Sequence, residues 1–416
     1  MKKTIGVFLN NKGTAQVDVS HLRDGNPGMG GTQFEFFILL NEIAKQDKYN
    51  VIYFGTALQK GLDTVKTIVV QDIYEAFAKC NELKVDILIS RDGGADRLDI
   101  LQNTKVIYWV HNFLPFEFCK TVGKNQKVKR VVFVSYQHRD FYLEMNVAKK
   151  ADVVFNSFYL PSKIEVKQYK ENIAVFVGNL VPIKKLHVVT EIWPDVVKKV
   201  PDAKLIVIGS GQTANRDKVL GPYNIAEESY EKRILAPLLK TNTIDTVHFA
   251  GVLGGDKKDI IASAKVAIAP NDKETFCISA LEYILSGVPV VGVSKGGIND
   301  VVENGKTGVL CKTKQGLKKN IIKVFKNKKR FDDLPTGIDY FEKNFAVDKF
   351  VEKWTQIIEE VDKDIPPHKI RARKPYSDKF KFIGLFFLLI RKIFHLPDGF
   401  SRVGIASRIS RWKRHG

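Results

Sequence analysis

The chain has 416 residues, enough for two domains that each bury a sizeable apolar core. Its four cysteines show neither disulfide-like nor metal-ligand spacing, which suits a reducing compartment, and no apolar run is long enough to cross a membrane. The net charge of +20 favours a partner that carries negative charge: nucleic acid, a membrane surface or a phosphate-bearing substrate.

The first half of the chain alternates apolar runs with amphipathic segments, which predicts strands alternating with helices. The run 5–9 follows Met-Lys-Lys-Thr but is too short for a signal peptide, so we expect it to belong to a buried first strand. Strands are predicted at 4–9, 51–54, 67–70, 86–90, 105–110, 131–135 and 151–156, and a helix follows the first strand over Phe34 to Ile43.

Two features of this half are candidate site elements. The glycine-rich loop from Gly25 to Gly31 would let backbone approach a ligand closely, although a plain turn explains it equally well. His111 stands at the carboxyl end of the strand predicted at 105–110. A single histidine is more often structural than functional, so both interpretations stay open.

The polar span 165–172 is a plausible linker to a second alternating set. Strands are predicted at 173–178, 203–208 and 247–250, with a helix over 188–200. Lys184 and Lys185 lie in the loop after the first of these strands and are equally consistent with a solvated surface pair. Neither Gly209-Ser-Gly211 nor Gly305-Lys-Thr completes a nucleotide-binding motif, because the first lacks the apolar helix that should follow and the second lacks the upstream glycine.

The segment from Val266 to Leu310 reads as strand, helix, strand, with strands at 266–269 and 288–293. Glu274 and Glu282 lie around the start of its helix, with seven residues between them. The backbone amides between them would bind an anion such as a diphosphate, and the carboxylates would accept hydrogen bonds from sugar hydroxyls. The alternative is a capping box, with Ser279 as N-cap and Glu282 as its partner.

The run Glu274-Thr-Phe-Cys-Ile-Ser-Ala-Leu-Glu282, followed by Ser286-Gly-Val-Pro-Val-Val, resembles the E-x7-E signature of family 4 retaining glycosyltransferases of GT-B fold. The resemblance implies that Glu274 contacts the donor sugar and Glu282 the nucleotide ribose. It also implies that the intervening segment binds the diphosphate through Phe276, Cys277, Ile278 and Ser279. Cys277 departs from the family pattern, which has glycine at that position.

The same resemblance assigns roles elsewhere in the chain. The loop at Gly30 and Gly31 would reach toward the donor phosphate, and His111 would lie near the acceptor and the transferred sugar. Lys184 takes the place of the family's diphosphate-binding lysine, whereas Asn179 replaces its arginine and removes one fixed charge. The remaining implied donor contacts are Gly209, Val252 and Leu253.

The sequence therefore predicts an α/β protein of GT-B fold, with two Rossmann-like domains facing across a cleft. We expect an acceptor-side domain at 1–170, a donor domain at 171–345, a helix crossing back to the first domain at 346–362, and a basic amphipathic tail at 363–416.

The predicted activity is metal-independent, retaining transfer of a sugar from a UDP- or GDP-linked donor to a glycan or lipid-linked acceptor in cell-envelope polysaccharide synthesis, without a cofactor. Glu274, His111 and Lys184 are the expected catalytic residues. The single Asp-x-Asp string, Asp362-Lys-Asp364, follows the long final helix and is interpreted as solvated. The alternatives are a non-catalytic nucleotide-sugar-binding protein and a nucleotide-sugar epimerase or hydrolase. Nucleic-acid binding is disfavoured, because the aromatic residues beside the basic runs form an apolar stripe.

Residues 366–416 hold thirteen Lys or Arg against two Asp, a net charge of +11. The apolar core Phe382–Ile390 is nine residues long, against the roughly 20 needed to span a bilayer. A second amphipathic segment carries Phe400, Val403, Ile409 and Trp412. We expect this tail to hold a cytoplasmic enzyme peripherally at the anionic inner face of the membrane. The alternative is that the apolar core docks on the first domain as a structural helix and the basic end is a loose tail.

Overall fold

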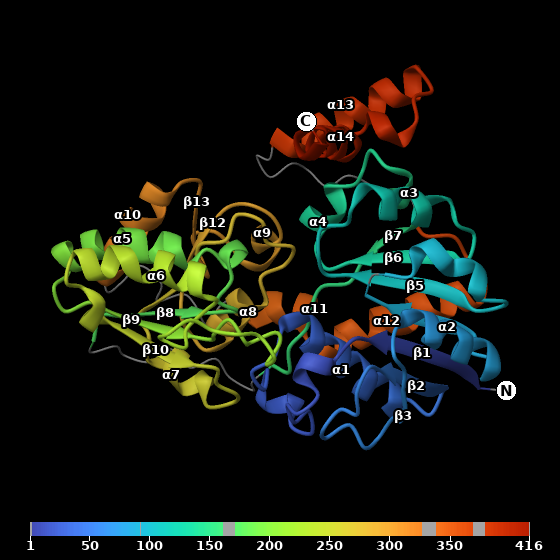
Figure 1. The fold of residues 1–416 in the computed structure, drawn as a ribbon, viewed down its shortest axis with the longest axis horizontal. Coiled ribbons are helices and arrows are strands. Elements are labelled where there is room, and N and C mark those ends of the chain that lie inside the picture. Colours follow the sequence, from blue (N-terminus) through green and yellow to red (C-terminus); the bar gives the residue numbers. More distant parts are fainter. Residues whose placement is uncertain (1, 92, 161–170, 327–337, 369–378, 416) are drawn as a thin grey trace.

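The computed structural model describes residues 2–91, 93–160, 171–326, 338–368 and 379–415. It contains two parallel β-sheets, each covered by helices on both faces, which lie side by side in Figure 1. This arrangement confirms the predicted pair of Rossmann-like domains. The predicted linker 165–172 falls mostly outside the described residues.

The first sheet has the strand order β3-β2-β1-β4-β5-β6-β7, so its direction of growth reverses between β1 and β4. Its strands are β1 (Lys3–Leu9), β2 (Tyr49–Gly55), β3 (Lys66–Val69), β4 (Ile87–Ser90), β5 (Lys105–Val110), β6 (Val128–Phe133) and β7 (Ala151–Val153). The α-helices of this part are α1 (Gly31–Lys45), α2 (Ile73–Glu82), α3 (Phe116–Lys124) and α4 (Tyr136–Asp140).

The second sheet has the order β10-β9-β8-β11-β12-β13 and reverses between β8 and β11. Its strands are β8 (Ile173–Val177), β9 (Lys204–Ile208), β10 (Val247–Gly251), β11 (Val266–Ala269), β12 (Val290–Val293) and β13 (Gly308–Cys311). Its helices are α5 (Leu186–Lys199), α6 (Glu228–Lys240), α7 (Lys257–Ser263), α8 (Ile278–Leu285), α9 (Ile298–Val301) and α10 (Lys314–Lys326). Ligands of such sheets bind beyond the carboxyl ends of the strands, at the point of reversal.

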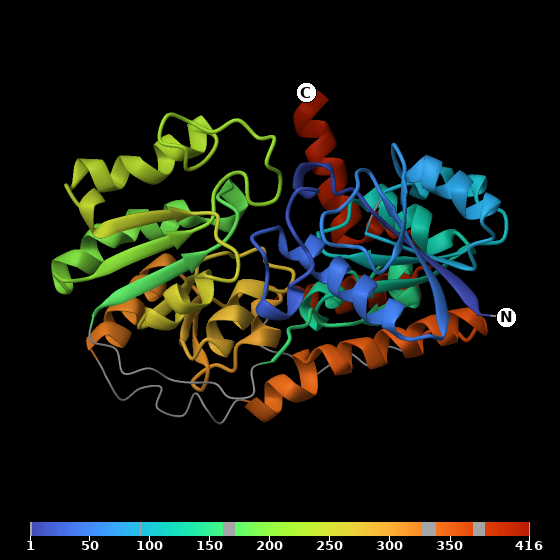
Figure 2. The ribbon, with the colours of Figure 1, turned by 90° about the horizontal axis from the view of Figure 1, so that it is seen from below.

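Helices α11 (Ile338–Phe345) and α12 (Val347–Asp362) follow the second domain, and Figure 2 shows α12 running along the first domain. Trp354 of α12 is fully buried, with its ring centroid 4.9 Å from that of Trp109. The Asp362 and Asp364 side chains are 29% and 56% exposed, which agrees with their interpretation as solvated, but they also form ion pairs. Asp362 pairs with Lys3, and Asp364 with Lys105 and Lys129, because the end of α12 meets basic side chains of the first sheet.

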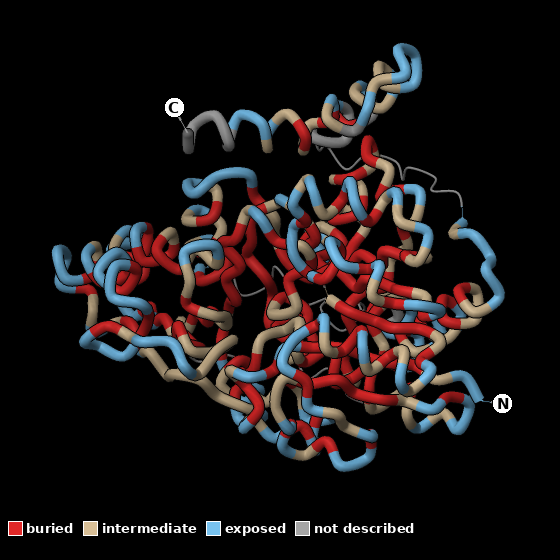
Figure 3. The backbone as a smooth tube through the Cα atoms, turned by 45° about the vertical axis from the view of Figure 1, so that its right-hand side comes forward, coloured by how far each residue is buried: buried red, intermediate tan, exposed pale blue. Residues whose placement is uncertain are grey.

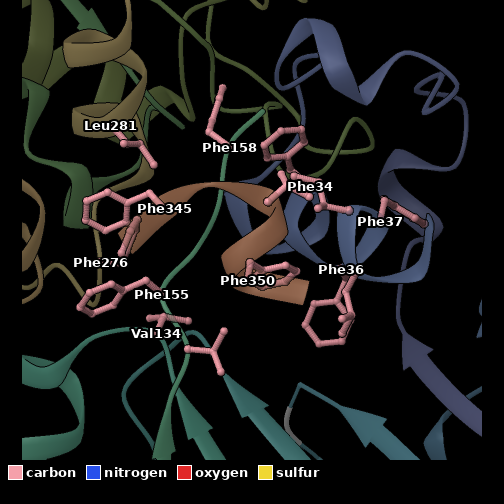
Figure 4. Close-up of a cluster of buried hydrophobic side chains, with 14 of the residues drawn as sticks. Phe34, Phe36, Phe37, Val134, Phe155, Phe158, Phe276, Leu281, Phe345 and Phe350 are labelled. Atoms are coloured by element: carbon pink, nitrogen blue, oxygen red, sulfur yellow. The ribbon is translucent and has the colours of Figure 1, made fainter. Parts of the chain in front are cut away.

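The apolar core continues from one domain into the other. Buried residues lie inside both domains, as the tube in Figure 3 shows, and one cluster extends from β1 and α1 to α8. Figure 4 shows Phe276, from the loop before α8, beside Phe155 and Phe345; its ring centroid lies 6.0 Å from that of Phe155 and 5.8 Å from that of Phe345. The segment that carries the predicted donor site is therefore anchored on residues of the domain connections.

The tail forms two helices, α13 (Lys379–Ile393) and α14 (Arg402–His415), which lie over α3 and α4 in Figure 1. Arg402 binds the fully buried carboxylate of Glu144, with Nε 3.0 Å from Oε1. The apolar core approaches the first domain at Gly384, as the structural alternative expected, but the basic segment is docked there as well, through Arg402, and is not a loose end. The outward side of the tail nevertheless exposes large apolar residues: Ile383, Phe386, Leu389, Ile393 and Phe394. Among the residues that the structure describes, no helix has the length and apolarity needed to traverse a bilayer.

Candidate functional site

A cleft of about 600 Å³ lies between the two domains, at the carboxyl ends of their strands. Both reversal points contribute loops to it, from β1 and β4 on one side and from β8 and β11 on the other. All fourteen site residues predicted from the sequence line this one cleft: Gly30, Gly31, His111, Asn179, Lys184, Gly209, Val252, Leu253, Glu274, Phe276, Cys277, Ile278, Ser279 and Glu282.

Helix α8 points its N-terminus into the cleft. It begins at Ile278, and its N-cap is Cys277, with φ of 81° and ψ of 67°. The capping-box interpretation, with Ser279 as N-cap, is therefore wrong. A left-handed φ suits glycine, so Cys277 is a strained position. Burial raises the pKa of the Cys277 thiol to about 12, so the side chain is a neutral thiol. The Ala280 N–H donates to the Cys277 carbonyl oxygen at 3.0 Å, whereas the amides of Ile278 and Ser279 precede the first helical hydrogen bonds and can bind an anion.

Glu274 is buried, and both its side chain and its backbone form hydrogen bonds. Its carboxylate accepts hydrogen bonds from Lys184 Nζ, at 2.8 and 3.0 Å, and from the side-chain amide of Asn271. Its carbonyl oxygen accepts a hydrogen bond of 2.8 Å from the backbone N–H of Gly297. A Cβ on Gly296, whose φ is 77°, would lie 2.1 Å from that same oxygen. Gly296 and Gly297, which follow β12, therefore let their loop pack directly against the backbone of Glu274 and hold this residue in place.

Glu282 lies inside the first two turns of α8 and forms an ion pair of 2.7 Å with Lys257 of α7. Both side chains are less than 10% exposed (8% for Lys257 and 6% for Glu282). A buried carboxylate beside one lysine keeps further lone pairs for a hydroxyl donor. Lys257 was not predicted from the sequence, since nothing distinguishes it from the many other lysines of the chain.

Lys184 and Lys185 follow β8, and their side chains lie in different surroundings. Lys184 faces the cleft, where burial would lower its pKa but the charge and hydrogen bonds of Glu274 outweigh this and raise it. Lys185 instead pairs with Asp272 at 2.6 Å and does not line the cleft. Asn179 lines it, and its buried Oδ1 has no hydrogen-bond partner within the described parts of the chain. Because asparagine carries no charge, the cation that the resemblance leads one to expect at this position is absent.

His111 directly follows β5, and its carbonyl oxygen accepts a hydrogen bond of 2.7 Å from the Thr275 hydroxyl, just before α8. Burial, together with the charge of Arg91 and then of His138, keeps its pKa well below the ordinary value, so the ring is neutral near pH 7. Its ring packs 4.6 Å from the Trp109 ring, centroid to centroid. Its Nε2 is buried, and no protein partner for it is found among the described residues. A neutral imidazole can exchange one hydrogen bond with a ligand hydroxyl.

The glycine-rich loop crosses the cleft to the second domain. A Cβ on Gly31 would lie 2.9 Å from a methyl carbon of Ile278, and one on Gly28 would lie 2.9 Å from the Leu253 carbonyl oxygen. Arg216 Nη2 donates a hydrogen bond of 2.6 Å to the Gly28 carbonyl oxygen. The loop is thus a contact between the domains, and a plain turn does not describe it.

Further cleft residues were missed by the sequence analysis. Asn271 and Lys273 precede Glu274 in the loop after β11, and Gln33, Arg91 and Asn156 come from the first domain. The position of Asn271 just after β11 was the available signal. In the described parts of the chain, no group of three or more His, Cys, Asp or Glu side chains is arranged to hold a metal ion.

Comparisons with known proteins agree with this geometry. Residues 161–335 match the family of glycosyl transferases group 1. An uncharacterized glycosyltransferase of Haemophilus influenzae is 21% identical over 86% of this chain and 100% of its own length. The capsular polysaccharide biosynthesis glycosyltransferase CapM of Staphylococcus aureus is 24% identical over 51% of this chain and 54% of its own. The resemblance to glycosyltransferases is therefore confirmed, whereas the roles of the individual residues stay predictions.

The fold also matches solved structures. The Anabaena protein HepE in complex with UDP and glucose superposes with a TM-score of 0.66 at 14% identity, covering 86% of this chain and 100% of HepE. At that identity the likeness shows the shared GT-B fold.

Proposed function

We propose that the chain is a group 1 glycosyltransferase of GT-B fold that transfers a sugar, with retention of anomeric configuration, from a nucleotide-sugar donor to a glycan or lipid-linked acceptor. The observation that carries the proposal is the convergence of Glu274, Lys184 and the N-terminus of α8 in one interdomain cleft.

Each of these groups has a part in the proposed transfer. As the bond between sugar and diphosphate breaks, negative charge builds on the departing diphosphate. Lys184 and the amides of α8 stabilise that charge in a site where water is scarce. Glu274 binds hydroxyls of the donor sugar and positions it, while Glu282 binds the ribose hydroxyls. His111, neutral and facing this region, hydrogen-bonds the transferred sugar or the acceptor.

The proposed donor is UDP- or GDP-linked and its use needs no metal ion, since Lys184 and the helix amides supply positive charge where a metal otherwise would. HepE, a structural relative, was solved with UDP and glucose, which supports UDP. CapM is named for capsular polysaccharide biosynthesis, which supports an envelope polysaccharide as the product.

The test is a panel of UDP-, GDP-, ADP- and CMP-sugars, read by thermal shift and by release of free nucleotide, with and without EDTA. We expect one nucleotide class to stabilise the protein and to be hydrolysed slowly, with no loss in EDTA. Lys184→Ala should reduce turnover by roughly a hundredfold, equivalent to a few kcal/mol. Stabilisation without release of nucleotide, even with glycan acceptors present, would instead favour the non-catalytic binding protein.

We also propose that the tail holds the enzyme at an anionic membrane. The exposed apolar side chains of α13 support this, because a row of large apolar residues beside basic ones suits a bilayer interface. Phe386→Ser with Leu389→Ser should reduce flotation with anionic liposomes and leave nucleotide release unchanged. These substitutions test the idea better than truncation at Asp364, which would leave Glu144 buried without Arg402. Unchanged flotation would refute the contact.

A further inference from the structure

A second cavity, of about 580 Å³, lies between α3 of the first domain and the hairpin of α13 and α14. It shares no residue with the interdomain cleft. Its walls are formed by Phe116, Lys120, Lys124, Asn146, Arg391, His395, Leu396, Pro397, Gly399 and Arg408.

The charge of this cavity is one-sided. Four permanent cations line it, Lys120 and Lys124 from α3, Arg391 from α13 and Arg408 from α14, and no Asp or Glu is among the described lining residues. Lys120 lies 3.9 Å from Glu117, and both of these side chains are at least half exposed. A phosphate bound among these side chains would accept charge-assisted hydrogen bonds from several cations at once.

The cations come from three different elements, so their convergence depends on how the hairpin is attached. Glu144 fixes it, accepting hydrogen bonds from Arg402 Nε at 3.0 Å and from the Arg402 backbone N–H at 3.2 Å. Arg402 Nη2 also donates to the Phe141 carbonyl oxygen at 3.0 Å. Ser401 next to it is fully buried. The cavity is thus built by a specific docking contact.

The apolar face of α13 adjoins this cavity. Ile393 and Phe394 are 58% and 65% exposed, and they stand between Arg391 and His395, which both line the cavity. Phe386 and Leu389 continue the exposed face along the helix. An anion site beside exposed apolar side chains matches a molecule with a charged head and an apolar tail.

We propose that this cavity binds the phosphate of an anionic membrane lipid, with the apolar face of α13 lying among the neighbouring acyl chains. The proposal deepens the membrane contact proposed above and rests on it, but not on the transfer reaction. In this proposal the lipid binds at a site that the first domain and the tail form together. Binding therefore depends on the docked position of the hairpin as well as on its positive charge.

The experiment uses the full chain and vesicles of phosphatidylcholine with or without phosphatidylglycerol. Lys124→Glu with Arg408→Glu reverses two cavity charges. Lys199→Glu with Lys319→Glu is the matched control, because it changes the net charge equally at two exposed lysines of the second domain. Inorganic phosphate and glycerol phosphate serve as soluble competitors, and nucleotide release reports the transfer site.

We expect the cavity variant to bind phosphatidylglycerol vesicles at least about tenfold more weakly, the control to change by less than about twofold, and both to release nucleotide normally. Equal binding by the two variants would overturn the site and leave only a general charge effect. Displacement of wild type from vesicles by millimolar soluble phosphate would overturn the lipid as ligand in favour of a free phosphate compound. Loss of nucleotide release alone would bear on the proposed function and not on this cavity.

Discussion

Each of the two cleft glutamates carries its own lysine. Lys184 balances Glu274, and Lys257 balances Glu282. Substitution of either glutamate by alanine would leave a lysine without its partner, and for the buried Lys257 this would cost about 3–5 kcal/mol of stability. Glutamine keeps the shape and one acceptor oxygen for the lysine, so it should cost less stability than alanine, and the free energy of unfolding of each variant measures the cost that remains.

We predict that Glu282→Gln mainly weakens nucleotide binding, by roughly tenfold, because one charge-assisted hydrogen bond to a ribose hydroxyl is lost. Glu274→Gln should instead lower turnover more than it lowers affinity for the bare nucleotide. Calorimetric titration with the nucleotide, alongside steady-state kinetics, checks both. A well-folded Glu274→Gln enzyme with normal turnover would contradict the assignment of Glu274 to the donor sugar.

Glu35 of α1 gives a prediction for pH. It is fully buried, and burial holds its pKa well above the ordinary value although the backbone N–H and the hydroxyl of Ser157 both donate to it. The folded state therefore binds this proton more tightly than the unfolded state does. That contribution to stability is present below the ordinary pKa of about 4.5 and is lost as the pH rises through the higher folded value.

Glu35→Gln removes this titration. The free energy of unfolding of the variant, relative to wild type, should increase with pH above about pH 4.5, by at most about 1.4 kcal/mol per pH unit. Chemical denaturation at a series of pH values measures it. Parallel curves for the two proteins would show that Glu35 keeps an ordinary pKa in the folded state.

At the scale of elements, the sequence predicted most strands to within a few residues. β5 and β11 match the predicted 105–110 and 266–269 at both ends, since each is an apolar run with a sharp polar boundary. β6 was predicted at 131–135 and forms over Val128–Phe133. The strand begins with Val128, Lys129 and Arg130, and two of these are charged residues that do not indicate a buried strand. Arg130 is buried because it forms ion pairs with Asp152 and Glu360. Such pairing between distant residues leaves no periodic signal.

The residues of the candidate site also divide into those that the local sequence predicts and those that only the tertiary structure brings together. Residues next to a strand end or in the E-x7-E run were predicted and line the cleft, because local chain direction places them there. Lys257 and Arg216 come from distant loops and helices, and only the packing of the chain brings them to the cleft region. The basic cavity under the tail could not be predicted for that reason either: it requires α3 and α14 to be side by side.

At the scale of the whole molecule, the two domains touch on both sides of the cleft. On one side are the chain segments that connect the two domains, together with α12. On the other side, the loop that contains Arg216 reaches the first domain. The Arg216 backbone N–H donates to the Gly13 carbonyl oxygen at 2.8 Å, and its side chain donates to the Gly28 carbonyl oxygen at 2.6 Å. The side-chain contact joins the glycine-rich loop of the first domain to the second domain.

We therefore predict that Arg216→Ala raises the KM for the donor by roughly tenfold, with a smaller change in kcat, because a hydrogen bond from a charged donor that favours the closed arrangement is lost. Thermal stability should change little, since Arg216 lies in a partly exposed loop and the two cores are untouched. Lys218→Ala, in the same loop but exposed, is the matched control. Equal donor KM values for the two variants would mean that closure depends on other contacts, such as the packing of Gly31 against Ile278.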